Sequence, residues 1–287
     1  MLLVTGATGK VGSAVLAELA NRSHRVRALV RDPARLSVHA PNIEIVKGDF
    51  ADAASLAAAM VGVDAAFLAS AFDPRMTELQ MNFVEAAKRA KLLRVVLLSG
   101  VGANAQQCCV RTLRWHGQIE ASLQIAGIQT TSLRSAFFFQ NLLKHAIMKD
   151  GIIAGPFRGI LWPWIDARDV GAAAAAALTQ PQHAGQTYTL STPEPLSYHD
   201  VALRLSTVLQ TPIKYLDISA NETRGRLRAE GASPVMIEAK LELWDAFASG
   251  YIKVEPSQIV KEVTGRDART LEDFARDYRD RFLLEAA

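Results

Sequence analysis

The sequence is poor in cysteine and in aromatic residues: two of its 287 residues are Cys, and 7% are Phe, Trp or Tyr. The two cysteines, Cys108 and Cys109, are neighbours, so a bridge between them would be strained, and no second pair exists for a disulfide framework. We expect two reduced thiols, although nearby Arg111, Arg114 and His116 would lower a thiol pKa and leave a redox role open. No spacing of Cys and His is typical of zinc, and no metal is expected.

Positive and negative charges are nearly balanced, because the chain has 32 Lys and Arg and 29 Asp and Glu, for a net charge of +3. The basic residues are dispersed, so a nucleic-acid partner is not expected. No apolar run approaches the roughly 18 residues of a membrane span, and Thr5 already lies in a glycine-spaced turn, which leaves no room for a signal peptide. We therefore expect a cytoplasmic protein without a membrane partner, and either a monomer or a homodimer.

The strongest motif lies in the first twelve residues. An apolar run, Leu2–Val4, leads into the turn Thr5-Gly6-Ala7-Thr8-Gly9-Lys10-Val11-Gly12 and then into a helical pattern. A dinucleotide needs this order, because the first glycine allows a sharp exit from the strand, the second lets a pyrophosphate approach the backbone, and the third lets the helix pack closely. The positive end of the helix then faces the phosphates.

Short apolar runs alternate with helical patterns through the first half of the chain, which is typical of a parallel sheet covered on both faces. We predict an α/β fold with a doubly wound parallel (Rossmann) sheet. The predicted strands are Leu2–Val4, Val26–Val30, Ile43–Val46, Ala65–Leu68, Val95–Leu98 and Thr130–Leu133. The predicted helices are Val11–Asn21, Ala53–Met60, Met76–Ala90 and Arg111–Ile125.

Prolines interrupt the pattern beyond Asp150. We predict a dinucleotide-binding domain over residues 1–150 and a smaller α+β region over residues 151–287, which covers the substrate and packs partly back on the first domain. The elements expected there are the helices Asp169–Leu178, Tyr198–Leu209, Met236–Phe247 and Leu271–Phe282 and the strand Gln186–Leu190.

The end of the second predicted strand decides which dinucleotide binds. An acidic residue there holds two ribose hydroxyls and favours NAD, whereas an arginine pairs with a 2′-phosphate and favours NADP. Arg31 and Asp32 both occur. We favour Arg31 and NADP(H), because Lys10 and Arg35 are expected to bring two further cations, while a solvated Arg31 remains the alternative.

Polar or aromatic residues also follow the next three strands. Asp49 would accept from the adenine amino group or, alternatively, cap the helix that begins near Ala53. Small residues around Ser70 would let the cofactor pass, with Phe72 beside the nicotinamide. Ser99 lies where hydride-transfer enzymes place a hydroxyl, although an ordinary turn serine fits equally well.

Together with the glycine turn, the segments Val30–Pro33, Gly48–Phe50, Leu133–Asn141, Ile165–Val170 and Gly185–Tyr188 resemble the NmrA-like family of atypical short-chain dehydrogenases/reductases. Within it, the chain is most similar to NADPH-dependent quinone, triphenylmethane-dye and flavin-free azo-dye reductases. The resemblance implies NADP(H) without flavin, with the 2′-phosphate on Arg31 and the nicotinamide near Ser135–Phe138. The expected cofactor residues are Gly6, Thr8, Gly9, Lys10, Val11, Gly12, Arg31, Asp49, Phe50, Ser70, Phe72, Ser99, Ser135, Ala136, Phe137 and Phe138.

One departure from the wider dehydrogenase pattern bears on the reaction. Short-chain dehydrogenases carry Tyr-x-x-x-Lys on the helix after the fifth strand, where the Lys lowers the Tyr pKa for proton transfer. Here that helix has no Tyr, and Ala121 stands where the Lys would be. A quinone or an azo compound needs little proton assistance, so orientation on the nicotinamide would supply most of the rate.

A flat aromatic acceptor would need apolar aromatic neighbours and a proton donor. His116 is the candidate donor, with Glu120 one turn later to orient it, although an ordinary surface histidine is the alternative. The same aromatics could simply be core residues. The expected substrate contacts are Phe72, His116, Phe137, Phe138, Trp162 and Trp164, with Phe139 in the same aromatic set.

Two other functions remain as alternatives. The chain would be a non-catalytic sensor of NADP(H) if it binds the dinucleotide without turnover, as regulators of this family do. A hydrolase built from Ser99, His116 and Asp166 lacks the G-x-S-x-G elbow and leaves the glycine turn without a role.

Overall fold

A seven-stranded parallel sheet forms the centre of the computed structural model, which describes residues 1–104, 109–143 and 148–286. The strand order is β11-β6-β5-β4-β1-β2-β3, and in register Val4 lies between Ala28 and Phe67. This confirms the doubly wound fold, the six strands predicted in the first half of the chain and the strand predicted over Gln186–Leu190. The strands are β1 (Leu2–Val4), β2 (Val26–Val30), β3 (Ile43–Lys47), β4 (Ala65–Leu68), β5 (Arg94–Gly100), β6 (Gln129–Ser135) and β11 (Thr187–Leu190).

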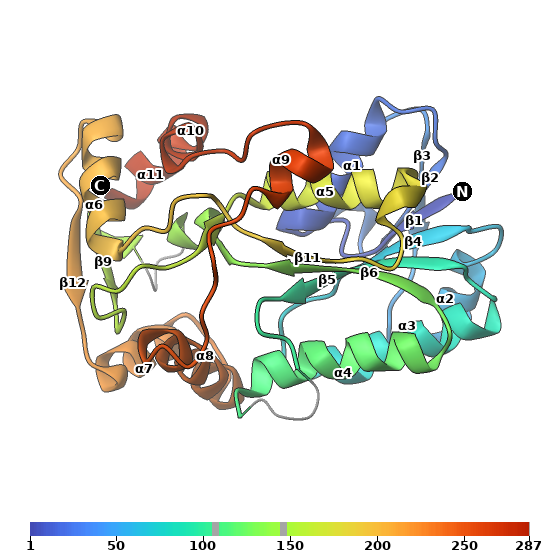
Figure 1. Ribbon diagram of the computed structural model, residues 1–287, viewed down its shortest axis with the longest axis horizontal. Coiled ribbons are helices and arrows are strands. Elements are labelled where there is room, and N and C mark those ends of the chain that lie inside the picture. Colours follow the sequence, from blue (N-terminus) through green and yellow to red (C-terminus); the bar gives the residue numbers. More distant parts are fainter. Residues whose placement is uncertain (105–108, 144–147, 287) are drawn as a thin grey trace.

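Helices cover both faces of this sheet (Figure 1). One face carries α1 (Lys10–Ala20), α5 (Ala167–Thr179) and α9 (Ile259–Thr264); the other carries α2 (Ala53–Ala59), α3 (Met76–Arg89) and α4 (Arg111–Ile125). The alanine-rich sequence of α5 allows it to lie directly against α1, since a Cβ on Gly171 would stand 2.5 Å from the Cβ of Ala14. The two helices therefore start side by side at the carboxyl ends of the strands.

The remaining elements gather beyond those carboxyl ends, on the left of Figure 1. They surround a second core of buried aromatic and aliphatic side chains. The strands are β7 (Phe137–Phe138), β8 (Met148–Lys149), β9 (Ile152–Gly155), β10 (Trp164–Ile165) and β12 (Lys214–Asp217). The α-helices are α6 (Tyr198–Leu209), α7 (Ala220–Ala229), α8 (Pro234–Ala248), α10 (Leu271–Asp277) and α11 (Arg279–Ala286), and the 3₁₀ turn is η2 (Phe139–Leu143). Two other 3₁₀ turns belong to the layer of the central sheet: η1 (Pro33–Arg35) follows β2, and η3 (Pro181–His183) follows α5.

The C-terminal part of the chain departs from the sequence expectation in two ways. The single helix expected over Leu271–Phe282 is two helices that separate at Tyr278, whose ψ of 18° ends α10. The strands β7, β8, β9, β10 and β12 and the helices α7 and α9 were not predicted, because the strands and α9 are short and α7 is almost entirely polar in sequence.

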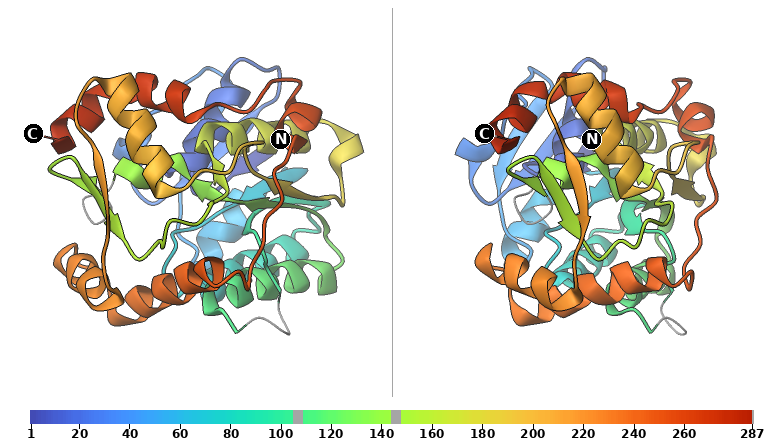
Figure 2. Two further views of the ribbon diagram at one scale, coloured as in Figure 1. Left: turned by 60° about the vertical axis from the view of Figure 1, so that its left-hand side comes forward. Right: turned by 90° about the vertical axis from the view of Figure 1, so that its left-hand side faces the viewer.

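Elements from both sides of residue 150 share the central sheet and its helical layer. The strand β11 pairs with β6, and α5 packs on α1, while α8 meets the start of α4 (Figure 2). The domain boundary at residue 150 stays a prediction. After that residue the chain returns to the helical layer of the central sheet in α5 and to the sheet itself in β11.

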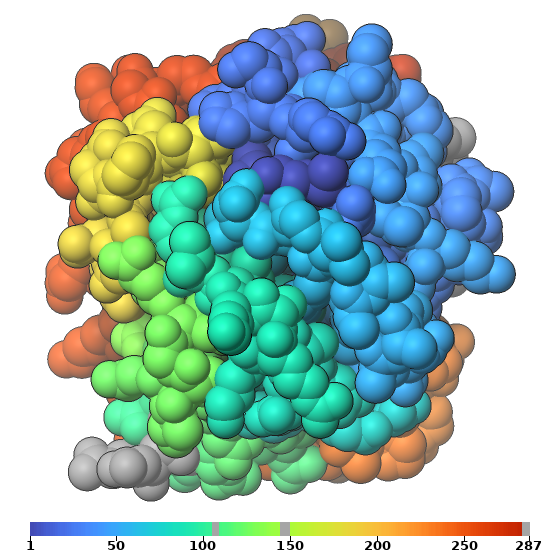
Figure 3. Space-filling model, turned by 90° about the vertical axis from the view of Figure 1, so that its right-hand side faces the viewer, coloured from blue at the N-terminus to red at the C-terminus, as the bar shows by residue number. Residues whose placement is uncertain are grey.

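Seen from the amino ends of the strands, the surface is formed mainly by the first half of the chain (Figure 3). Within the described residues, no helix combines the length and apolar character needed to cross a bilayer.

Candidate functional site

The glycine turn after β1 is shaped by contacts that side chains would block. Gly6 has a φ of +59°, a conformation that L-residues rarely adopt, and a Cβ on Gly12 would stand 2.1 Å from the carbonyl oxygen of Gly6. The turn is closed by the Gly9 N–H donating to the Gly6 carbonyl at 2.8 Å. Thr5, which is fully buried, donates its hydroxyl to the carbonyls of Phe67 and Ala69 and so ties the turn to the end of β4.

The first turn of α1 has N–H groups that no side chain of the described chain caps. Gly9 is the N-cap, and the first turn holds no acidic residue. Such a helix start is suited to an anionic ligand, because its N–H groups and its dipole both favour negative charge. The geometry of this turn therefore fits the predicted pyrophosphate cradle.

The two residues that end β2 have different surroundings. Asp32 accepts from the Ala34 N–H at 3.1 Å and caps the turn η1, whereas the Arg31 side chain is exposed. The Lys10 ammonium donates to the Gln140 carbonyl at 3.2 Å and to Asn141 Oδ1 at 3.1 Å, and its expected place beside Arg31 at a 2′-phosphate stays a prediction. Both acceptors belong to η2, which follows β7.

The end of β3 resolves the alternative left open for Asp49. The carboxylate that caps α2 belongs to Asp52, which accepts from Ala54 and Ser55, while Asp49 accepts from the Ala51 N–H at 2.8 Å. Phe50 is half-buried and packs on Phe83, with ring centroids 5.7 Å apart. Asp49 and Phe50 thus remain predicted adenine contacts, and capping is excluded.

At the end of β4, Ser70 and Phe72 face different neighbours. The Ser70 hydroxyl accepts from Gln80 Nε2 at 2.9 Å. Phe72 is 43% exposed and meets Trp115 of α4 edge to face, at a centroid distance of 6.4 Å. A partly exposed aromatic pair of this kind offers a flat apolar surface to a ligand.

Ser99, at the end of β5, is engaged in a buried polar network. Its hydroxyl donates to Glu120 at 2.6 Å, and Arg134 donates two hydrogen bonds to the same carboxylate, at 3.1 and 2.6 Å. Ser99 is 2% exposed. Its predicted place at the cofactor therefore does not agree with this geometry, in which the hydroxyl is directed to α4.

His116 of α4 lies against the last residues of β5. A Cβ on Gly100 would stand 3.1 Å from His116 Cδ2, and among the described residues the buried Nδ1 has no hydrogen-bond partner. Burial lowers the pKa of His116 from 6.5 to about 4, and the charge of Glu120 opposes this only in part. The imidazole is therefore neutral at pH 7, and Glu120, expected to orient it, binds Ser99 and Arg134 instead.

The aromatic residues predicted to hold the substrate divide into two groups. Phe137 and Phe138 are half-buried, and Phe137 packs at 4.8 Å from both Trp162 and Phe247. Trp162 and Trp164 have no exposed surface, and their N–H groups donate to the carbonyls of Phe157 and Leu196.

The two tryptophans are core residues, and their predicted contact with a substrate does not agree with this burial. Phe139 is buried with them, stacked on Trp164 at 5.6 Å. These side chains support the second core from within and present no face to a ligand.

The residues of the alternative hydrolase do not come together. Ser99 donates to Glu120, and Asp166 accepts from Gln140 and Arg168. Within the described ranges, no group of three or more His, Cys, Asp or Glu side chains is placed to hold a metal ion. Cys109 is an exposed free thiol, and Cys108 lies outside the described residues.

One buried polar residue was missed by the sequence reasoning although it lies in the recognised motif. Gln140 is 5% exposed; its amide donates to Asp166 Oδ1 at 2.8 Å and its oxygen accepts from the Ala167 N–H at 3.0 Å. Through Gln140, η2 is joined to the first turn of α5. The only signal in the sequence was an amide side chain inside an otherwise apolar aromatic run.

The comparison with known proteins identifies the fold class and the family. A model of the NmrA-like family matches residues 1–275. The chain belongs to the NmrA-like family, which confirms the resemblance seen in its motifs.

Two relatives are similar over almost their entire length. The NAD(P)H azoreductase of Xenophilus azovorans is 33% identical over 285 residues, 98% of this chain and 99% of the relative. The (4-alkanoyl-5-oxo-2,5-dihydrofuran-3-yl)methyl phosphate reductase of Streptomyces griseus is 33% identical over 291 residues, 99% of this chain and 100% of the relative.

Among solved structures, an NADPH-dependent quinone oxidoreductase of Escherichia coli, complexed with NADPH, superposes with a TM-score of 0.85 at 23% identity, covering 96% of this chain and 99% of that chain. The Citrobacter sp. triphenylmethane reductase complexed with NADP(H) has a TM-score of 0.82 at 23% identity, over 96% of this chain and 99% of its own. At this identity the structures show a shared fold.

Proposed function

We propose that this chain is a reductase that uses NADPH, without a flavin, to reduce an electron-poor aromatic acceptor such as a quinone or an azo compound. The observation that carries the proposal is the glycine turn, in which a Cβ at Gly12 would meet the Gly6 carbonyl at 2.1 Å. The oxidoreductase class follows from the two relatives at 33% identity over nearly the full chain, both of which are reductases by name.

The chain's own residues fit a nicotinamide dinucleotide across the carboxyl ends of the strands. Gly6–Gly12 would receive the pyrophosphate at the uncapped start of α1, and exposed Arg31 would pair with a 2′-phosphate. Asp49 and Phe50 would contact the adenine, and the backbone of Ser135–Phe138 with Ser70 would border the nicotinamide end. When bound, the reduced nicotinamide supplies a hydride.

On the acceptor side, the half-exposed pair Phe72–Trp115 and the imidazole of His116 border the ends of β4 and β5. The aromatic faces would hold a flat ring, and orientation supplies the rate enhancement. Because the pKa of His116 is about 4, its neutral ring would act by hydrogen bonding, while water delivers the proton to the reduced acceptor. No tyrosine occurs in α4 to perform this transfer.

The test is NADPH oxidation by the purified protein, first shown to be free of flavin absorbance, with a panel of quinones, azo dyes, triphenylmethane dyes and simple ketones. We expect turnover with at least one electron-poor aromatic acceptor and none with simple ketones. Tight NADPH binding without turnover on any acceptor would overturn the enzyme proposal in favour of a non-catalytic NADP(H) sensor. Failure to bind NADPH would overturn both.

A further inference from the structure

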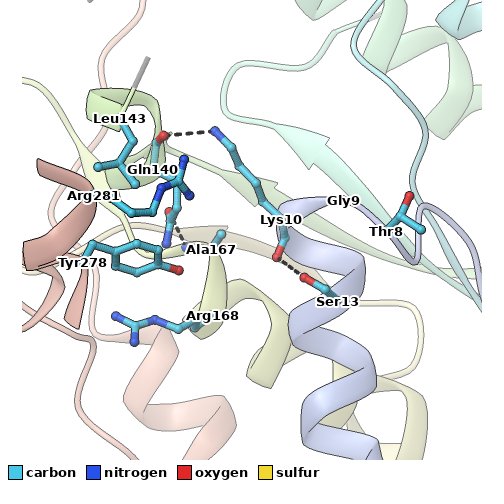
Figure 4. A pocket seen from close by; sticks show the side chains of 10 residues that line it. All are labelled: Thr8, Gly9, Lys10, Ser13, Gln140, Leu143, Ala167, Arg168, Tyr278 and Arg281. Carbon is cyan, nitrogen blue, oxygen red and sulfur yellow. Dashed lines mark hydrogen bonds between the residues drawn. The ribbon is translucent and has the colours of Figure 1, made fainter. Parts of the chain in front are cut away.

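Gln140 connects three segments that border the proposed dinucleotide site. Its buried side chain donates to Asp166 Oδ1 at 2.8 Å and accepts from the Ala167 N–H at 3.0 Å. Its backbone carbonyl accepts from the Lys10 ammonium at 3.2 Å. Figure 4 shows Gln140 between Lys10 of α1 and Ala167 of α5, with hydrogen bonds to both. A single residue of η2 therefore contacts the beginnings of both helices.

The segment just before Gln140 is the expected border of the nicotinamide. Ser135–Phe138 ends β6 and forms β7, and β7 pairs in parallel with β10, so that Phe138 lies beside Ile165. The strand β10 leads directly into Asp166, the N-cap of α5. The backbone pairing of β7 with β10 and the side chain of Gln140 thus connect the same two segments at successive positions, and the place of the border depends on both.

Gln140 is also connected to the glycine turn along two routes. Lys10, the first residue of α1, donates both to the Gln140 carbonyl and to Asn141 Oδ1. By its amide, Gln140 holds the start of α5, and α5 packs directly on α1 at Gly171. The contacts from α1 to η2, from η2 to α5 and from α5 back to α1 form a closed ring. This ring fixes the separation between the glycine turn and the border of the nicotinamide.

The two partners of the Gln140 side chain require an amide. One partner is a carboxylate oxygen, which needs a donor, and the other is a backbone N–H, which needs an acceptor; an amide carries both groups. A glutamate would place a second carboxylate against Asp166, which has no exposed surface. A methionine of similar length would make neither hydrogen bond.

We propose that Gln140 is a positioning residue, which holds the border Ser135–Phe138 at the separation from the glycine turn that presents the nicotinamide to the acceptor. This role needs a bound NADPH and so rests on the function proposed above. Without the amide, the border would shift against the turn while the phosphate contacts at the turn remain. A misplacement of about 1 Å at the reacting atoms costs on the order of 100-fold in rate.

The test compares Gln140→Met and Gln140→Glu with wild type. Gln140→Met removes both hydrogen bonds, and Gln140→Glu keeps the acceptor for the Ala167 N–H, so that it supports the start of α5 if the methionine variant does not fold. Asn42→Leu is the matched control, because the Asn42 amide donates to three backbone carbonyls, at 2.9, 3.1 and 3.0 Å, at the amino ends of the strands.

For each protein, four quantities are measured: the free energy of unfolding, the affinity for NADPH, the anisotropy decay of the bound nicotinamide fluorescence, and kcat and KM with 1,4-naphthoquinone. The kinetics are repeated with NADPH that carries deuterium at C4. We expect the Gln140 variants to keep their affinity for NADPH, while kcat falls about 100-fold, the isotope effect on kcat rises and the nicotinamide fluorescence depolarises faster. Asn42→Leu should lose stability without any of these changes.

Wild-type kcat, isotope effect and anisotropy decay in a folded Gln140 variant would overturn the positioning role and leave Gln140 a purely structural residue. The same changes in Asn42→Leu would also overturn it, because they would then follow from lost stability. If wild type binds NADPH but reduces no acceptor, the proposed function fails, whereas faster depolarisation in the Gln140 variants still supports the positioning of the nicotinamide. Failure of wild type to bind NADPH would overturn both.

Discussion

The layer that contains the glycine turn and the region beyond the strand ends are built by different means. In the first, short-range backbone contacts set the geometry: Gly6 turns with positive φ, and Gly12 leaves room for its carbonyl. In the second, large aromatic side chains from distant segments pack together, as Phe157 does on Tyr198 with ring centroids 3.7 Å apart. The geometry of the glycine turn thus depends on the absence of side chains, whereas the region beyond the strand ends is held together by large side chains.

The largest expected effect comes from removing bulk on the aromatic side. Trp162→Ala should lower the free energy of unfolding by about 3–5 kcal/mol, because a fully buried indole leaves a cavity. Affinity for NADPH should fall far less at a temperature where the variant is folded. Leu203→Ala is the control, since Leu203 is 68% exposed and its loss should cost about 0.5 kcal/mol or less. Chemical denaturation and NADPH titration measure the two quantities; parallel losses of both would remove the distinction between the regions.

Adding a single methyl group to the glycine turn should affect the affinity for NADPH more than the free energy of unfolding. Gly12→Ala should weaken NADPH binding by about 100-fold, since the new Cβ meets backbone atoms that cannot move aside. Gly225→Ala is the matched control in α7, because its Cβ would enter open space and should stabilise the helix by about 0.5–1 kcal/mol. Fluorescence titration with NADPH distinguishes them, and unchanged affinity in Gly12→Ala would show that the turn does not hold the dinucleotide.

The choice between dinucleotides should depend on the end of β2. Arg31→Ala should weaken NADPH binding about 30-fold through loss of charge-assisted hydrogen bonds to the 2′-phosphate, with little change for NADH. Parallel titrations of both cofactors provide the measurement, and Arg25→Ala controls for the general loss of positive charge. Equal losses for NADPH and NADH would mean that Arg31 does not contact the phosphate.

The smallest effect concerns pH. Because the folded pKa of His116 is about 4 and lies below its usual value of 6.5, the unfolded state binds the proton more readily, and stability falls as the pH drops from about 6.5 to 4. His116→Gln should flatten this dependence, and His24→Gln, at an exposed position, should leave it intact. Urea midpoints between pH 4 and 7 are the readout; an unchanged slope in His116→Gln would contradict the burial of its imidazole.

Features that depend on neighbouring residues were predictable from the sequence, and those that depend on distant packing were not. The glycine turn and the six predicted strands were found, since glycine spacing and apolar runs are local signals. The burial of Trp162 and Trp164 was missed, because an indole in a core and one in a pocket look alike in sequence. The hydrogen-bond partners of Lys10 lie about 130 residues away in η2, and no local sequence pattern predicts them. Ser99 was assigned to the cofactor although Glu120 on α4 takes its hydroxyl.

The order of elements has a consequence for synthesis on the ribosome. The last strand of the sheet, β11, pairs with β6, and the face of α1 around Ala14 is covered by α5, so both reach the first layer only after the aromatic region has begun to emerge. A nascent chain ending near residue 150 would expose the apolar side of α1 and leave β6 as an open edge, a template for wrong pairing. Translation of the first half alone therefore leaves this strand edge and this helix face uncovered until α5 and β11, which ends at Leu190, have been made.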